Sequence, residues 1–555
     1  FTILLMNTIT LTLSGGKTMQ AAAGCKACDL LDFFGEPASS IIAVRFNNEI
    51  CSLIQPLQNS GTLEPVCTGS SEGSAIYRRS LCFLLAAAAN ELFPGKRLAV
   101  GHSLGYGYYY TLDTDAPVSA ESVNMLKTKM EDLVAKDYPI RQSFISYEEA
   151  IALFEKLNLR ETRKQLNFIC PPHFKINTLN GFSDLYFGPL LPSTGYLTLF
   201  DVMPYREGFL LRYPKTSEPD RIGKFEDIPQ LFNVYKQYKD WGKLLGVTSA
   251  ADLNELISKR KVNDFVNITE TLQNKCIADI ADQIKDSGDV KTVLIAGPSS
   301  SGKTTTSKKL TMQLQVLGYQ PKVIELDSYY VGRELTPRDE NGEYDYEALE
   351  ALDVEQLNRD LQDLFDGKEI RIPSYNFVEG KRYYSGKTMQ LEKRNILIME
   401  GIHGLNDKLT PSVPKEQKFK IYLSALTQLN LDDHNRIPTS DNRLIRRIVR
   451  DSQFRGKSAS ETIKMWPNVQ KGERLHIFPF QDNANAMLNT ALDYELSVLK
   501  VYAEPLLRCV TPLQREYAEA GRLLRFLSNF SPIPANFVPG QSIIREFIGG
   551  SEFKY

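Results

Sequence analysis

The sequence has few cysteines and no long apolar run. Eight cysteines are scattered over 555 residues, which is not the density of a disulfide framework. Cys25 and Cys28 form a CxxC pair without a second pair or a flanking histidine, so we expect a helix start that carries two thiols, not a metal site. No apolar run approaches the ~18 residues of a membrane-spanning helix. These absences favour a cytoplasmic protein and no membrane partner.

An excess of charge is also absent. The chain holds 65 Lys+Arg and 67 Asp+Glu, for a net charge of −2. Residues 1–220 contain 19 basic and 22 acidic residues. A surface that grips nucleic acid needs a basic surplus, so we do not expect nucleic acid as the partner. Residues 1–13 lack a basic signal-peptide start and alternate as a strand does, with Met6 as the natural first residue and residues 1–5 as an addition.

One stretch matches a nucleotide-binding pattern without a mismatch. An apolar run at 293–296 leads into GPSSSGKT, and a helical sequence follows. A loop without bulky side chains points its backbone N–H groups at phosphate oxygens, and the helix dipole adds to the attraction. Lys303 can reach the β- and γ-phosphates, and the Thr304 hydroxyl can hold Mg²⁺. The predicted ATP-binding residues are Gly297, Pro298, Ser299, Ser300, Ser301, Gly302, Lys303, Thr304 and Thr305.

Two further apolar segments end in an acid. PKVIELDSYY is predicted to be a second buried strand with Asp327 at its carboxyl end, and NILIMEGIHGL a third strand that ends at Glu400. In a parallel α/β sheet, ligands bind at the carboxyl ends of the strands. An acid at Asp327 could accept a hydroxyl proton, help to hold Mg²⁺, or do both.

Arginines gather in a later segment. Five of them are predicted to lie on one helix and its exit: Arg443, Arg446, Arg447, Arg450 and Arg455. A solvated basic helix face is the simpler interpretation. Because the same chain carries a triphosphate site, we favour a clamp on the phosphates.

With these residues in view, residues 290–510 resemble the uridine kinase/phosphoribulokinase family. The likeness rests on GPSSSGKTT, LDSYY, PSYNF, the strand ending in MEG, and the lid sequence DNRLIRRIVRDSQFRG. It implies an α/β, doubly wound P-loop fold that transfers the γ-phosphate of ATP, with Mg²⁺, to a hydroxyl of a small molecule, typically the 5′-OH of a nucleoside. The implied catalytic residues are Asp327 as the base, Lys303, Glu400, and the lid arginines Arg450 and Arg455. The implied metal ligands are Thr304, Asp327 and Glu400, and the implied substrate contacts are Tyr330, Asp345, Tyr375, Arg447 and Lys457.

Two departures from the family pattern concern the acceptor. Gly380 stands where uridine kinases usually have a base-contacting histidine, and Lys457 stands where the lid usually has a second arginine. Both changes weaken pyrimidine recognition. The acceptor therefore stays open between a uridine-like nucleoside, another nucleoside and a sugar phosphate.

The N-terminal half carries two other likenesses. Residues 6–65 resemble the ubiquitin-like TGS domain, and residues 76–215 resemble the second N-terminal domain of threonyl-tRNA synthetase, which hydrolyses mischarged tRNA. The positions that match its catalytic histidines and cysteine are Arg79, Phe83, Tyr186 and Leu190, and only Asp184 is retained. We therefore predict a retained scaffold with a lost editing site. An ATP-gated RNA-binding or sensor protein is the alternative function from another class.

The predicted layout has five parts: a TGS-like domain at 1–65, a synthetase-like α+β domain at 66–220, a helical linker at 221–284, the P-loop domain at 285–510, and a C-terminal strap at 511–555. His102 is predicted to be a structural histidine. The alternating tyrosines that follow are predicted to form the core of a strand. An oligomer is left open.

Overall fold

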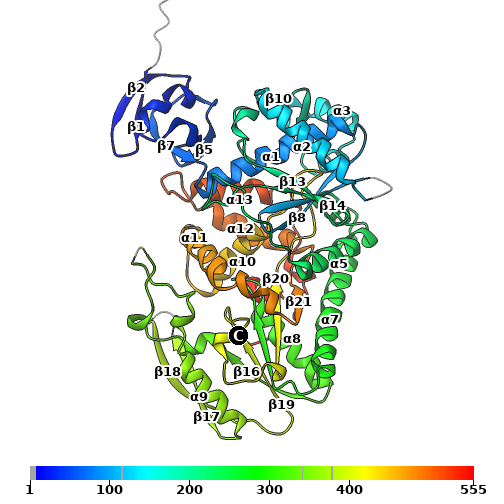
Figure 1. Ribbon diagram of the computed structural model, residues 1–555, viewed down its shortest axis with the longest axis vertical. Helices are drawn as coiled ribbons and strands as arrows, with labels where there is room; N and C mark the ends of the chain where they lie inside the picture. Colours follow the sequence, from blue (N-terminus) through cyan, green and yellow to red (C-terminus); the bar gives the residue numbers. More distant parts are fainter. Residues whose placement is uncertain (1–7, 114–116, 341, 377–378, 555) are drawn as a thin grey trace, which may run out of the picture.

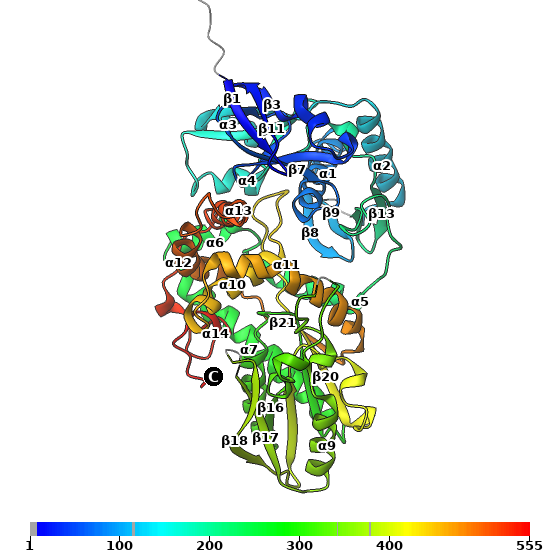
Figure 2. The ribbon, with the colours of Figure 1, turned by 90° about the vertical axis from the view of Figure 1, so that its left-hand side faces the viewer.

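The computed structural model describes residues 8–113, 117–340, 342–376 and 379–554. The predicted chain start at Met6 lies outside these residues. The molecule is elongated (Figure 1 and Figure 2), with two N-terminal units at one end, a parallel sheet at the other, and the helices of residues 439–527 between them.

The first unit is a five-stranded sheet with the strand order β2-β1-β7-β4-β5. Its strands are β1 (Thr8–Leu13), β2 (Thr18–Ala22), β4 (Ile41–Phe46), β5 (Glu49–Ser52) and β7 (Gly61–Cys67). Asn47 and Asn48 both have positive φ, at 48° and 60°, as a two-residue hairpin turn requires. The likeness to a TGS domain remains a prediction.

The expected helix at the CxxC pair is not an α-helix. Cys25 lies in the short strand β3 (Cys25–Lys26), and Cys28 lies in a 3₁₀ helix at Ala27–Phe33. A segment of seven residues is too short to make an isolated α-helix favourable. Both thiols are free.

The second unit packs antiparallel strands around the buried helix α1 (Ser71–Leu92). One sheet has the order β13-β14-β9-β8 and the other β10-β11-β12. The strands are β8 (Leu98–Leu104), β9 (Gly107–Leu112), β10 (Arg141–Ser146), β11 (His173–Leu179), β12 (Phe182–Asp184), β13 (Asp201–Tyr205) and β14 (Gly208–Arg212). The helices are α2 (Ala120–Ala135), α3 (Tyr147–Lys156) and α4 (Arg160–Gln165).

Of the residues predicted to be structural in this unit, His102, Tyr109 and Tyr110 are buried, whereas Tyr108 is partly buried. His102 is 6% exposed, and its ring lies 5.8 Å from that of Tyr235. Burial holds its pKa well below the ordinary value. Tyr109 and Tyr110 of β9 are 4% and 1% exposed. Tyr106, in the turn before the strand, is exposed.

Three helices connect the second unit to the parallel sheet. They are α5 (Pro229–Leu245), α6 (Ala250–Ser258) and α7 (Val262–Asp286). α7 leads into the first strand of the sheet, as predicted, and Figure 1 shows it running along one side of the molecule.

The C-terminal half is a doubly wound α/β unit. Its five strands pair in parallel in the order β16-β19-β15-β20-β21. They are β15 (Thr292–Ala296), β16 (Gln320–Glu325), β19 (Asn395–Glu400), β20 (Lys418–Ser424) and β21 (Ala486–Asn489). A two-stranded hairpin, β17 (Ile370–Asn376) and β18 (Lys381–Met389), stands beside the sheet.

Alternate residues of the central strand face opposite layers, because side chains on a strand alternate between its faces. Val293 and Ile295 pack with α7 and with α8 (Lys303–Val316). Leu294 packs on the other face with α9 (Val354–Phe365). Helices therefore cover both faces, as the predicted fold requires.

β16 differs from the prediction of a buried strand. It lies at the edge of the sheet, and Ile324 is its one fully buried residue. Asp327 follows it in a 3₁₀ turn, Leu326–Tyr329.

The tail packs on the P-loop unit. One apolar core is shared by four helices: α10 (Thr439–Phe454), α11 (Ala459–His476), α12 (Glu495–Arg508) and α13 (Tyr517–Leu527). The short helix α14 (Arg545–Ile548) joins the same core through Phe547 and Ile548. Residues 511–516 also contact the first unit, where Arg515 pairs with Glu64 at 3.1 Å.

Candidate active site

The phosphate-binding loop links the central strand β15 to α8. Gly302 has a φ of 79°, which a glycine adopts without strain. A Cβ on Gly297 would lie 2.5 Å from the Leu423 carbonyl oxygen, so only glycine fits there. Lys303 Nζ donates to the carbonyls of Gly297 and Pro298, at 3.1 and 3.3 Å. The Lys303 side chain thus contacts the backbone of the loop with which it is predicted to bind the phosphates.

The predicted metal ligands Thr304 and Glu400 are in direct contact. Thr304 Oγ1 donates to Glu400 Oε1 at 2.8 Å. Burial raises the pKa of Glu400 to about 7, and Asp327 acts in the same direction, whereas Lys303 and the Thr304 hydrogen bond oppose the rise. Hydroxyl and carboxylate oxygens suit Mg²⁺, which keeps several waters and phosphate oxygens when it binds a protein. In the described part of the chain, no group of three or more His, Cys, Asp or Glu side chains is placed to hold a metal ion.

Asp327 interacts electrostatically with the side chains of Lys303, Arg450 and Arg455. Desolvation by the surrounding protein raises the pKa of Asp327, and the charges of Lys303, Arg455 and Arg450 oppose that rise. The side chain itself keeps a solvent-exposed surface. An incoming hydroxyl could therefore reach it.

Two of the five arginines are not phosphate clamps. Arg443 and Arg446 are 4% and 0% exposed. Arg443 forms a two-pronged ion pair with Glu473, and Arg446 pairs with Glu495 at 2.5 Å. Each also donates to the loop backbone, Arg443 to the Ser299 carbonyl and Arg446 to the Ser300 carbonyl, both at 3.1 Å. The prediction of a clamp is wrong for these two, because buried carboxylates already neutralise them and they hold the loop instead.

The other three arginines surround one carboxylate. Asp451 is fully buried and lies 3.3 Å from Arg447, 2.8 Å from Arg450 and 3.8 Å from Arg455. Three cations around one anion leave a positive surplus. Arg447 also donates to Ser299 Oγ at 2.7 Å. Lys457 instead has its Nζ 3.2 Å from the sulfur of Met465 on α11.

The predicted acceptor contacts come from three separate segments. The rings of Tyr330 and Tyr375 lie 5.5 Å apart. Asp345 accepts from the Glu347 N–H at 3.1 Å. Burial raises the pKa of Glu347 to about 7. The charge of Glu473 adds to this rise, as does that of Asp327, whereas Arg447 and Lys303 oppose it. Glu347 was not predicted, and nothing in its local sequence distinguishes it from a surface acid.

The positions matching the synthetase editing site are filled. Phe83 is buried against Tyr186 with the rings 5.2 Å apart, and Arg79 donates to the Pro189 carbonyl. Asp184 Oδ2 lies 2.7 Å from Nδ1 of His434, a residue of the loop between β20 and α10. The neighbouring Asp433 accepts from Arg97 and from the first N–H groups of α4. The loss of the editing site remains a prediction from the sequence.

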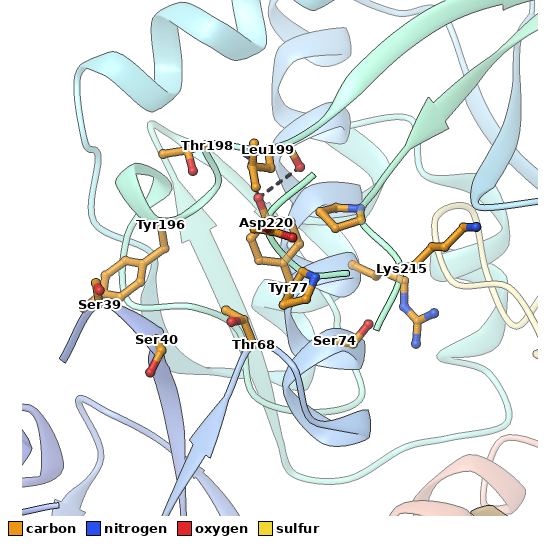
Figure 3. Close-up of a pocket in the computed structure, with 13 residues that line it drawn as sticks. Ser39, Ser40, Thr68, Ser74, Tyr77, Tyr196, Thr198, Leu199, Lys215 and Asp220 are labelled. Atoms are coloured by element: carbon orange, nitrogen blue, oxygen red, sulfur yellow. Dashed lines mark hydrogen bonds between the residues drawn. The ribbon is translucent and has the colours of Figure 1, made fainter. Parts of the chain in front are cut away.

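A pocket of about 270 Å³ opens between the first two units. Figure 3 shows its lining of hydroxyl-bearing side chains, with Tyr77 hydrogen-bonded to Leu199. Its lining contains none of the predicted site residues. Among the described residues, no helix is both long and apolar enough to cross a membrane.

One family model matches the C-terminal unit. Residues 292–496 are similar to the phosphoribulokinase/uridine kinase family. The matched region is one part of a longer chain. A solved structure described as a possible uridine kinase from Bacillus stearothermophilus is 19% identical, and the match covers 39% of this chain and 98% of that one, at a TM-score of 0.27.

The N-terminal region of the chain is similar to threonine–tRNA ligases. The ligase of Pelobacter propionicus is 28% identical over 199 residues, which is 36% of this chain and 31% of the ligase. The ligase of Rubrobacter xylanophilus is 31% identical over 196 residues, or 34% of this chain and 30% of the ligase. The chain thus spans about a third of the length of these relatives.

Proposed function

We propose that the protein transfers the γ-phosphate of ATP to a hydroxyl of a small molecule, with the 5′-OH of a nucleoside as the favoured acceptor. The proposal rests on one observation. The Thr304 hydroxyl donates to the Glu400 carboxylate at 2.8 Å beside the phosphate-binding loop, and Asp327 lies close enough to Lys303 for the lysine charge to oppose the rise that burial causes in its pKa. These groups come from three different strand ends, where α/β folds bind ligands.

Each residue has a distinct task in this mechanism. The 297–304 loop and Lys303 hold the β- and γ-phosphates, and Thr304 with Glu400 would hold Mg²⁺, which neutralises phosphate charge when bound. Asp327 accepts the proton of the acceptor hydroxyl. Arg450 and Arg455 carry the positive surplus toward the transferring group. Positioning and electrostatics supply most of the acceleration.

The acceptor side favours a nucleoside through its aromatic faces and not through its charge. Asp327 and Glu347 face the cations Lys303, Arg447, Arg450 and Arg455, and Asp345 lies 3.6 Å from Nε2 of His476. Charge alone therefore does not separate an uncharged alcohol from a sugar phosphate. Tyr330 and Tyr375 offer aromatic faces on which a planar base can stack.

An acceptor panel tests the proposal. Nucleosides and sugar phosphates are each incubated with Mg·ATP and the full chain, and ADP release is measured. We expect turnover with a nucleoside, lost in Lys303→Ala. Turnover with sugar phosphates alone would contradict the acceptor class, and activity unchanged in Lys303→Ala would contradict the site.

The RNA-binding alternative gains no support from the N-terminal half, because Phe83 and Asp184 are fully buried and Asp184 is paired with His434. A filter-binding titration with tRNA at physiological salt decides between the two functions. Submicromolar, salt-sensitive binding would favour the RNA-binding protein.

A further inference from the structure

The tail places a carboxylate on the phosphate-binding helix. Glu546, on α14, accepts two hydrogen bonds through Oε2, from the Thr305 N–H at 3.1 Å and the Thr305 hydroxyl at 2.7 Å. Thr305 is the third residue of α8, and the first N–H groups of a helix have no partner within the helix. In a P-loop protein these groups serve the phosphates. An acidic side chain therefore holds a donor that the proposed ATP site needs.

The segment around Glu546 is fixed against the loop. Ile543 is fully buried, and a Cβ on Gly302 would lie 2.6 Å from its Cγ2 atom. Phe547 is also fully buried, with the guanidinium of Arg446 5.1 Å from the centre of its ring. The backbone of the tail thus packs on the phosphate-binding loop. Glu546 itself is only partly buried, so its side chain can rotate into solvent while α14 stays in place.

Glu546 differs from the other acid that contacts the loop. Glu473 accepts from the Ser299 N–H at 3.0 Å, but the two-pronged pair with Arg443 neutralises its charge. Within the described ranges, Glu546 has no ion-pair partner within 4 Å. Its negative charge therefore acts on the helix end uncompensated, where a phosphate would meet both the charge and an occupied donor.

We propose that Glu546 is an affinity determinant that competes with the phosphate tail of a nucleoside triphosphate for the amino-terminal end of α8. The inference rests on the proposed nucleotide site. Nucleotide enters when the carboxylate swings away from Thr305. The tail thereby raises the ATP concentration at which the nucleotide site becomes occupied.

The test is the dissociation constant of Mg·ATP, measured by calorimetry on the full chain. Glu546→Gln keeps the size of the side chain and removes the charge, and Glu546→Ala removes the contact. We expect ATP to bind roughly 3- to 10-fold more tightly to both variants, with the gain shrinking as salt rises. The matched control is Glu552→Gln in the same tail, where the glutamate accepts from Gln541 at 2.9 Å. The control is expected to match the wild type.

The outcomes separate this inference from the proposed function. If wild-type protein binds ATP, Lys303→Ala abolishes binding, and both Glu546 variants bind as the wild type does or more weakly, the competition is refuted while the nucleotide site stands. If no variant binds ATP, the proposed function and this inference fail together. Tighter binding by Glu546→Ala but not by Glu546→Gln would attribute the effect to bulk and refute a role for charge. A thermal melt of each variant shows that the fold is retained.

Discussion

The buried pair between Arg446 and Glu495 predicts a large stability loss when the arginine alone is removed. Arg446 is 0% exposed and donates to Glu495, to the Thr490 carbonyl and to the Ser300 carbonyl. Arg446→Met would leave a carboxylate in the core without a cation, and such a loss typically costs about 3–5 kcal/mol. Asn442 and the Leu492 N–H also donate to Glu495, so we expect a loss near about 3 kcal/mol.

Urea unfolding followed by fluorescence measures this loss locally. The chain has two tryptophans, and Trp466 lies on α11 in the same apolar core, so a Trp241→Phe background reports on that core alone. With a slope of about 3 kcal/mol per molar urea, the midpoint should fall by about 1 M. Arg359→Met is the control, because its pair with Glu355 is exposed at the surface and should contribute about 0.5 kcal/mol or less.

A double-mutant cycle can refute the reasoning. Arg446→Met/Glu495→Leu removes both charges and leaves none buried alone, so it should cost less than the sum of the two single changes. Additive losses, or a loss for Arg446→Met no larger than for the Arg359 control, would refute the reasoning that removing Arg446 leaves Glu495 as an uncompensated buried charge.

Three further predictions concern catalysis and pH. Asp327→Asn should lower kcat about 100-fold or more in an ADP-release assay while the ATP dissociation constant changes little, and a wild-type rate would remove Asp327 as the base. Chelation of Mg²⁺ with EDTA should abolish turnover and restored Mg²⁺ should recover it; turnover unaffected by EDTA would contradict the roles of Thr304 and Glu400. Burial raises the pKa of Asp432 to about 7, so the folded chain binds a proton that the unfolded chain releases above about 4. The free energy of unfolding should therefore fall as pH rises from about 4 to 7, and Asp432→Asn should flatten that part of the profile of urea midpoints; an unchanged slope would argue against the assignment.

Local chemistry explains what could be predicted from the sequence. The glycines, Lys303 and Thr304 of the loop are adjacent in the chain, and the buried strands β15 and β19 read as apolar runs. The Asn47–Asn48 turn was predictable for the same reason, since asparagine tolerates positive φ. β16 was predicted to be buried, because an apolar run does not reveal whether a strand lies at the edge of a sheet.

The groups that sequence reasoning missed are acids that act far from their own position in the chain. Glu473 contacts a residue 174 positions away, and Glu546 contacts one 241 positions away. Nothing adjacent to either acid in the sequence points to the phosphate-binding loop, because Glu546 stands in an apolar segment and Glu473 on a helix of mixed polarity. The arginine helix was misassigned in part for the same reason, since only the fold shows that Glu473 and Glu495 already neutralise Arg443 and Arg446.

The loop that carries Asp433 and His434 makes the two halves of the chain depend on each other. If the chain were cut before α7, Asp433 would lose its ion pair with Arg97, and His434 would lose its contact with the Asp184 carboxylate. The same loop leads into α10, where Arg446 donates to the carbonyl of Ser300 in the phosphate-binding loop. Separating the halves would thus leave buried polar groups without partners on both sides of the cut, so neither half is a self-contained structural module.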